Sequence, residues 1–162
     1  MPAVGGVRRY WDSFCFIALL NDDEGADDCE KILDDAKEGK TQIIVSPVTQ
    51  VEVIRPRGTP HPIPQEHKET IRAFFENDYI KWRNIDRRIA DLARDLCWQH
   101  NVHPRDAMHL AVAIDTECDL VETFDGHLLT LTGQIKVKDA LLTIAKPRWT
   151  GQLELLAKQE KG

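Results

Sequence analysis

Short apolar segments of strand length alternate along this chain with segments of helical pattern, and this alternation restricts its fold more than any other feature. Such alternation is typical of β–α units, in which parallel strands form one sheet that helices cover on both faces. We therefore predict an α/β fold, a three-layer α/β/α sandwich with a mainly parallel central sheet. The predicted strands are residues 7–11, 42–45, 80–82, 120–123 and 135–137.

Apolar residues at helical spacing fill the intervals between these strands. Ser46 and Pro47 have the pattern of an N-cap followed by a proline at the first helical position, so we expect a helix there that carries Glu52. Residues 105–115 are apolar on nearly every side, which predicts a buried helix. Other helices are predicted at residues 14–20, 29–36, 71–75 and 89–97, and residues 149–156 of the tail also have helical spacing.

Size and composition disfavour several classes of protein. The 162 residues are enough to bury one core, and we predict a single domain over residues 1–162. With 21 Lys and Arg against 27 Asp and Glu, the net charge is −6, so we expect no broad basic face that coats nucleic acid. The longest apolar run, residues 14–20, is too short to cross a bilayer, and the N-terminus lacks the layout of a signal peptide.

The cysteines give no sign of a disulfide framework. The chain has four of them, scattered and without a C-x-x-C pair. Three lie within apolar helical patterns, so we expect reduced thiols in the core of a cytoplasmic protein. The four are Cys15, Cys29, Cys97 and Cys118.

Four acidic residues fall at the ends of predicted strands or at the start of the elements that follow them: Asp12, Glu52, Asp106 and Asp125. In open α/β sheets, ligands bind beyond the carboxyl ends of the strands. Two carboxylates about 4 Å apart repel by roughly 4 kcal/mol at an effective dielectric near 20, so a cluster of four needs cations. Ligands that are all oxygen indicate Mg²⁺ or Mn²⁺ rather than zinc.

Each of these acidic residues also has a purely structural interpretation. Asp12 can cap the helix that follows it, and Glu52 can be a solvated helix residue. Asp106 in a first helical turn is favoured by the helix dipole. Asp125 and Gly126 form an ordinary turn dipeptide. It is their joint placement at one edge of the sheet that favours a site.

Four strings carry the most specific pattern: YWDS at residues 10–13, SPVTQVE at 46–52, PRDAMHLAVA at 104–113 and VETFD at 121–125. Their order and spacing resemble those of PIN-domain nucleases, most closely the VapC-like toxins of bacterial toxin–antitoxin pairs. The resemblance covers about residues 7–137 and leaves residues 138–162 as a C-terminal extension. It implies a metal-dependent endoribonuclease, in which a metal-activated water hydrolyses RNA to a 5′-phosphate and a 3′-hydroxyl.

The resemblance also implies roles for individual residues. Asp12, Glu52, Asp106 and Asp125 match the catalytic and metal-binding acidic quartet of the family, and Ser13 and Thr123 match the hydroxyl positions beside the metals. His109 matches a histidine of the helix motif, for which we expect a packing or hydrogen-bonding role. The chain departs from the family at Phe14, where many relatives carry a small or amide residue.

Charge and the resemblance also indicate where the substrate binds and which partners the protein has. Residues 55–105 carry a net positive charge, and residues 55–64 form a loop with four of the eight prolines. Arg55 and Arg57 lie on this loop a few residues beyond Glu52, so we predict that they bind RNA. The resemblance further implies a homodimer and a small antitoxin that blocks the acidic cleft with an inserted arginine.

Other interpretations remain weaker. His100, His103, Asp106 and His109 recur every three residues as in a zinc site, but Pro104 separates the first pair from the second. A receiver-like regulatory domain would need paired acids near the first strand. The chain's acidic pair at residues 22–23 lies too far beyond that strand. A PIN-like module that binds RNA or a protein without cleaving stays open as the alternative function.

An aromatic platform for single-stranded RNA is also conceivable. It would require that the aromatic side chains be exposed, whereas we expect core packing for most of them. The candidates are Tyr79, Trp82, Trp98 and Trp149.

Overall fold

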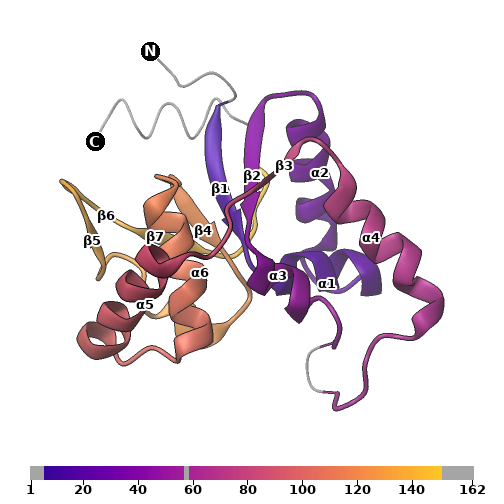
Figure 1. Cartoon of the computed structure of the whole chain (residues 1–162). Coiled ribbons are helices and arrows are strands. Elements are labelled where there is room, and N and C mark those ends of the chain that lie inside the picture. Colours follow the sequence, from indigo (N-terminus) through magenta and orange to yellow (C-terminus); the bar gives the residue numbers. More distant parts are fainter. Residues whose placement is uncertain (1–5, 57–58, 151–162) are drawn as a thin grey trace.

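The computed structural model describes residues 6–56 and 59–150, and a five-stranded parallel sheet lies at its centre (Figure 1). The strand order is β3-β2-β1-β4-β7, and every neighbouring pair is parallel. Helices lie on both faces, so the predicted three-layer α/β/α fold is confirmed. The strands are β1 (Val7–Trp11), β2 (Thr41–Val45), β3 (Ile80–Trp82), β4 (Leu120–Glu122) and β7 (Thr143–Ala145).

Helices connect these strands as the sequence pattern predicts. A short 3₁₀ turn at Gln65–His67 precedes α4. Within the described residues, no helix combines the length and apolarity that a membrane span requires. The helices are α1 (Ser13–Asn21), α2 (Ala26–Lys37), α3 (Pro47–Glu52), α4 (Lys68–Glu76), α5 (Arg87–His100), α6 (Pro104–Asp115) and α7 (Gly126–Leu129).

The two faces of the sheet build two apolar cores, because successive side chains of a strand point to opposite faces. Tyr10 of β1 belongs to the core that α5 and α6 cover. The next residue, Trp11, belongs to the core that α1, α2 and α4 cover. The residues just after Trp11 therefore emerge at the carboxyl edge of the sheet between the two helical layers.

A buried ion pair joins β1 and β4 within the sheet. Arg9 Nη1 lies 2.8 Å from Glu122 Oε2, and Trp11 Nε1 donates a hydrogen bond of 2.9 Å to Glu122 Oε1. Arg9 Nε also donates to Thr41 Oγ1 at 3.1 Å. Burial raises the pKa of Glu122, although the neighbouring Arg9 opposes that shift. The sheet thus encloses a carboxylate together with its own cation.

The end of the chain differs from prediction in three places. Residues 135–137 were predicted as the last strand of the sheet, but β5 (Lys136–Val137) pairs with β6 (Ala140–Leu141) in a separate antiparallel hairpin. The fifth strand is instead β7, which no pattern indicated. The predicted turn at Asp125 and Gly126 is the start of α7. The predicted helical spacing of residues 151–156 lies outside the described residues.

The four cysteines are free, as expected. Cys15 and Cys29 are buried in the core beneath α1 and α2. Burial also raises the pKa of the Cys118 thiol to about 11, so this cysteine is a protonated thiol at neutral pH.

Candidate active site

Asp12 follows β1 and lies buried at the carboxyl edge of the sheet. One carboxylate oxygen caps α1 by accepting a hydrogen bond of 3.0 Å from the backbone N–H of Phe14. The other accepts a hydrogen bond from the hydroxyl of Thr123, which follows the neighbouring strand β4. Burial raises the pKa of Asp12 to about 6, against the lowering effect of His109 and of these hydrogen bonds. The capping interpretation of Asp12 is therefore confirmed, and its role as a metal ligand stays a prediction.

Asp125 is tied to the same edge through Thr123. Its backbone N–H donates to Thr123 Oγ1 at 3.0 Å, and its carboxylate caps α7 by accepting from the N–H of Leu128 at 2.9 Å. Thr123 thus connects Asp12 and Asp125 by hydrogen bonds from one side chain. This is the role expected of a hydroxyl residue that positions two acidic groups.

Asp106 lies in the first turn of α6 and is half-buried. Its carboxylate makes no hydrogen bond and no ion pair with the described residues. Burial raises the pKa of Asp106, and the negative charges of Asp125 and Glu52 raise it further. His109 and His103 oppose this shift only in part. Asp106 is therefore a carboxylate without a cation beside other carboxylates.

Glu52, the last residue of α3, is held by two side chains of α6. Its Oε1 contacts Nε2 of the buried His109, and its Oε2 lies 3.4 Å from Nε of Arg105. The other ring nitrogen of His109, Nδ1, lies 2.5 Å from the hydroxyl of Tyr10. A chain of contacts therefore runs from Tyr10 in the sheet through His109 to Glu52.

Tyr10, at the core end of these contacts, is held by further hydrogen bonds. The hydroxyl of Tyr10 lies 2.9 Å from Ser46 Oγ and 3.2 Å from Thr49 Oγ1. Burial raises the pKa of Tyr10, so its hydroxyl keeps its proton and acts as a hydrogen-bond donor. The expected hydrogen-bonding role of His109 is confirmed.

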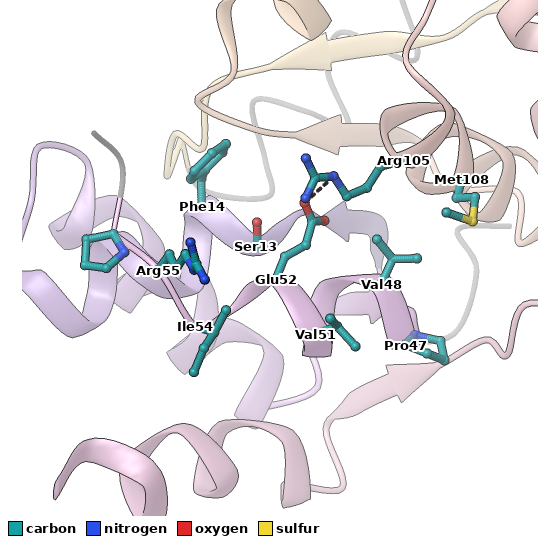
Figure 2. A pocket seen from close by; sticks show the side chains of 11 residues that line it. Ser13, Phe14, Pro47, Val48, Val51, Glu52, Ile54, Arg55, Arg105 and Met108 are labelled. Carbon is teal, nitrogen blue, oxygen red and sulfur yellow. Dashed lines mark ion pairs between the residues drawn. The ribbon is translucent and has the colours of Figure 1, made fainter. Parts of the chain in front are cut away.

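A pocket of about 760 Å³ lies beside Glu52 and extends over α1, α3 and α6 (Figure 2). Ser13 lies in its wall, and so does Arg55, whose Nη1 donates to the backbone oxygen of Pro60 at 3.1 Å. Arg55 therefore lies in the pocket wall beside Glu52, and its binding of RNA stays a prediction. Arg57 falls outside the described residues.

A family model for the PIN domain matches residues 9–133. The chain belongs to the PIN domain family. The match includes the acidic quartet and the elements that position it, from β1 to the segment that follows α7.

Solved structures agree with this PIN fold. VapC20 of Mycobacterium tuberculosis, titled a sarcin-ricin loop cleaving toxin, is 16% identical with a TM-score of 0.56, over 73% of this chain and 90% of that one. A toxin–antitoxin complex from Klebsiella pneumoniae is 19% identical with a TM-score of 0.52, over 72% and 86%. At such identities the likeness shows the fold. A comparison with curated proteins finds no match.

In this PIN domain the four acidic side chains lie at one edge of the sheet, but their present positions do not form a complete metal-coordination site. The charge of Glu52 contributes to the raised pKa of Asp12, and the charges of Asp125 and Glu52 contribute to the raised pKa of Asp106. However, the described residues contain no group of three or more His, Cys, Asp or Glu side chains placed to hold a metal ion as they stand. Glu52 in particular is turned toward His109 and Arg105.

The histidines of the weaker zinc interpretation have other roles. His103 Nδ1 accepts a hydrogen bond of 3.3 Å from the backbone N–H of Arg105, which caps α6. His109 is buried against Tyr10 and Glu52. The described side chains therefore do not support a zinc site.

Sequence reasoning missed some participants of the site and misplaced others. Arg105 and Tyr10 were not singled out, because their partner or anchor residues lie far away in the chain. The expected core packing of the aromatic residues is wrong for three tryptophans. Trp82, Trp98 and Trp149 are 40%, 76% and 41% exposed, on elements scattered over the molecule.

Proposed function

We propose that this PIN domain is a Mg²⁺- or Mn²⁺-dependent endoribonuclease and the toxin component of a toxin–antitoxin pair. The observation that carries the proposal is the state of Asp106. This carboxylate has no partner among the described residues, and burial and Asp125 raise its pKa. A folded protein that leaves such a charge unpaired next to other carboxylates is suited to bind a cation there.

The donor set fits a hard divalent ion. Asp12, Asp106 and Asp125 offer only carboxylate oxygens, which Mg²⁺ and Mn²⁺ prefer, and Glu52 contributes a fourth acidic group beside them. When bound, such an ion supplies an activated water and neutralises the negative charge of the phosphodiester.

The chain's own residues then have distinct tasks. Thr123 fixes the orientation of Asp12 through its hydroxyl and of Asp125 through that residue's backbone N–H. His109 and Arg105 hold Glu52 in place. Ser13 would support the site with its hydroxyl from the pocket wall.

The basic groups of the loop would bind the substrate. Arg55 lies in the pocket beside Glu52 and offers a guanidinium that attracts the phosphate backbone of RNA. Arg57 would add a second positive charge two residues further on. Because the rest of the site is acidic, these charges would reduce the repulsion of an anionic substrate.

The structural neighbours support the finer parts of the proposal. One is titled a toxin that cleaves the sarcin-ricin loop, and the other is a toxin–antitoxin complex. By this similarity, the proposed function includes cleavage of RNA and an antitoxin partner. From the family resemblance of the sequence, we further propose a cytoplasmic location, a homodimer, and an antitoxin that is small and blocks the acidic cleft with an arginine.

A cleavage assay tests the proposal. Wild-type protein with Mn²⁺ should cut RNA, EDTA should stop the cutting, and Asp12→Asn or Asp106→Asn should slow it by about 100-fold or more. Asp115→Asn, at the other end of α6, is the matched control and should leave the rate unchanged. Growth arrest on expression, relieved by Asp12→Ala, would support the toxin role.

The same assay distinguishes the alternative. RNA binding without any cleavage in Mg²⁺ or Mn²⁺ would favour a non-catalytic PIN module. Cleavage that persists in EDTA or in Asp106→Asn would contradict the role assigned to the carboxylates.

A further inference from the structure

We propose that the pocket beside Glu52 binds one unpaired nucleobase of the RNA, next to the phosphate at the acidic edge. This inference deepens the proposed function and rests on it. It specifies the substrate as RNA with at least one unstacked nucleotide at the cleavage site.

The pocket walls are mostly apolar although the pocket is open to solvent. Val51 and Ile54 are 74% and 44% exposed, and they face the pocket beside Val48 of α3 (Figure 2). Met108 and the aromatic ring of Phe14 extend this apolar surface from α6 and α1. Exposed apolar patches of this kind, when bordered by polar groups, mark binding sites.

Two guanidinium groups border this apolar surface. Arg55 comes from the loop after α3, and Arg105 comes from α6 and is ion-paired with Glu52 (Figure 2). Among the described residues Arg55 forms no ion pair with a carboxylate, so its charge is available to a phosphate. An apolar surface beside such a cation complements a nucleotide in an RNA strand, which has a flat base next to a phosphate. The charge pattern therefore favours RNA as the occupant.

The place of Glu52 in this pocket would determine which phosphate of the RNA lies at the acidic edge. Glu52 lines the pocket together with Ser13 and Arg105, which directly follow Asp12 and directly precede Asp106 in the chain, so the pocket lies next to the acidic edge. A base held against Val51 and Phe14 would place a neighbouring phosphate near that edge. The pocket would thus select the bond to be cut.

The chemistry of the walls also limits what can be recognised. A base within a duplex has both faces stacked and cannot enter, so the nucleotide must be unpaired. The apolar side chains stack on or contact any base face but read no donor or acceptor edge. We therefore expect discrimination between a base and no base, and little discrimination among the four bases.

Single abasic substitutions test the proposal. In a single-stranded RNA of about 12 nucleotides, each position in turn would carry an abasic nucleotide. Binding to the wild-type protein would be measured by fluorescence anisotropy in EDTA, and cleavage in Mn²⁺. One position should weaken binding by about 10-fold when it is abasic, and cleavage should fall at the same position.

Two exposed apolar residues provide the variant and its matched control. Val51→Ser removes two methyl groups from the pocket wall at an exposed helical position. It should abolish most of the difference in binding affinity between intact RNA and RNA that is abasic at the sensitive position. Leu141→Ser, 57% exposed on the β5–β6 hairpin away from the pocket, should leave that difference unchanged.

The outcomes separate this inference from the proposed function. A flat abasic scan, no RNA binding, or an unchanged scan in Val51→Ser would overturn the base site. One abasic-sensitive position without cleavage in Mn²⁺ would support the base site and contradict the nuclease. Cleavage in Mn²⁺ together with a flat abasic scan would support the nuclease and contradict the base site.

Discussion

The two ends of α6 carry an aspartate each, in opposite electrostatic situations. Asp115 at the last position has two arginines, with Arg83 Nε at 2.9 Å and Arg88 Nε at 3.4 Å. Asp106 in the first turn forms no ion pair with any of the described residues, and Asp125 and Glu52 lie close enough to raise its pKa. The same residue type on the same helix is thus compensated at one end and uncompensated at the other.

The helix dipole explains why this difference is informative. An acidic residue is disfavoured at a helix C-terminus, so the arginines around Asp115 remove a structural problem. The N-terminus favours an acidic residue, yet burial and neighbouring charges still raise the pKa of Asp106. The fold therefore neutralises Glu122 within the sheet with Arg9, and Glu52 at the edge with Arg105. In the part of the chain that the structure describes, Asp12, Asp106 and Asp125 have no ion pair with a lysine or arginine.

The largest effect is expected where a compensated carboxylate loses its cation. Arg9→Met should lower the free energy of unfolding by about 3–5 kcal/mol, because Glu122 would stay buried without a partner. Urea unfolding measures this change. The double variant Arg9→Met with Glu122→Leu should recover most of the loss, and a loss under about 1 kcal/mol in the single variant would break the comparison.

At the sheet edge, removing a carboxylate is expected to raise the free energy of unfolding. In protein without divalent cations, Asp12→Asn should raise the free energy of unfolding by about 2 kcal/mol above pH 6, because the wild-type protein must keep a buried carboxylate charged there.

The pH dependence of this gain follows from its sign. The folded-state pKa of Asp12 is raised to about 6, so the cost is absent below the unfolded value near 4 and grows as pH rises through 6. Urea unfolding at several pH values should therefore show the two proteins converging near pH 4. A variant that is less stable than wild type at pH 7 would contradict the account.

The smallest effects sharpen the comparison between the ends of α6. Asp106→Asn should raise the free energy of unfolding by less than Asp12→Asn does, because it removes a carboxylate whose pKa burial and Asp125 raise. Asp115→Asn should lower the free energy by about 0.5–1 kcal/mol, because it loses its contact with Arg83. Thermal unfolding of both variants without divalent cations measures the signs, and equal signs would contradict the argument.

Much of the fold could be predicted because its elements carry strong local patterns. The apolar run of β2 and the apolar spacing of α2 and α5 are long enough to reveal their period. β7 has only three residues, and β5 and β6 have two each, which is too short for any period to be detected. β7 pairs with the edge of β4, and β5 pairs with β6, so these assignments depend on the partner strand rather than on a local pattern.

The positions of the candidate site residues could be predicted from the sequence, but their contacts could not. Asp12, Asp106 and Asp125 were placed correctly at the carboxyl edge, because parallel strands bring their ends to one side. The contacts of Glu52 with His109 and Arg105 join residues more than fifty positions apart, and no local pattern encodes them. Whether an acidic side chain is paired depends on such distant neighbours.

Calorimetric titration of Mn²⁺ into the wild-type protein, Asp106→Asn and Asp115→Asn tests whether the unpaired carboxylate of Asp106 binds a divalent cation. We expect wild type and Asp115→Asn to bind the ion alike, whereas Asp106→Asn should bind it at least about 10-fold more weakly. Equal Mn²⁺ binding by Asp106→Asn and wild type, or no binding by the wild type, would contradict this expectation.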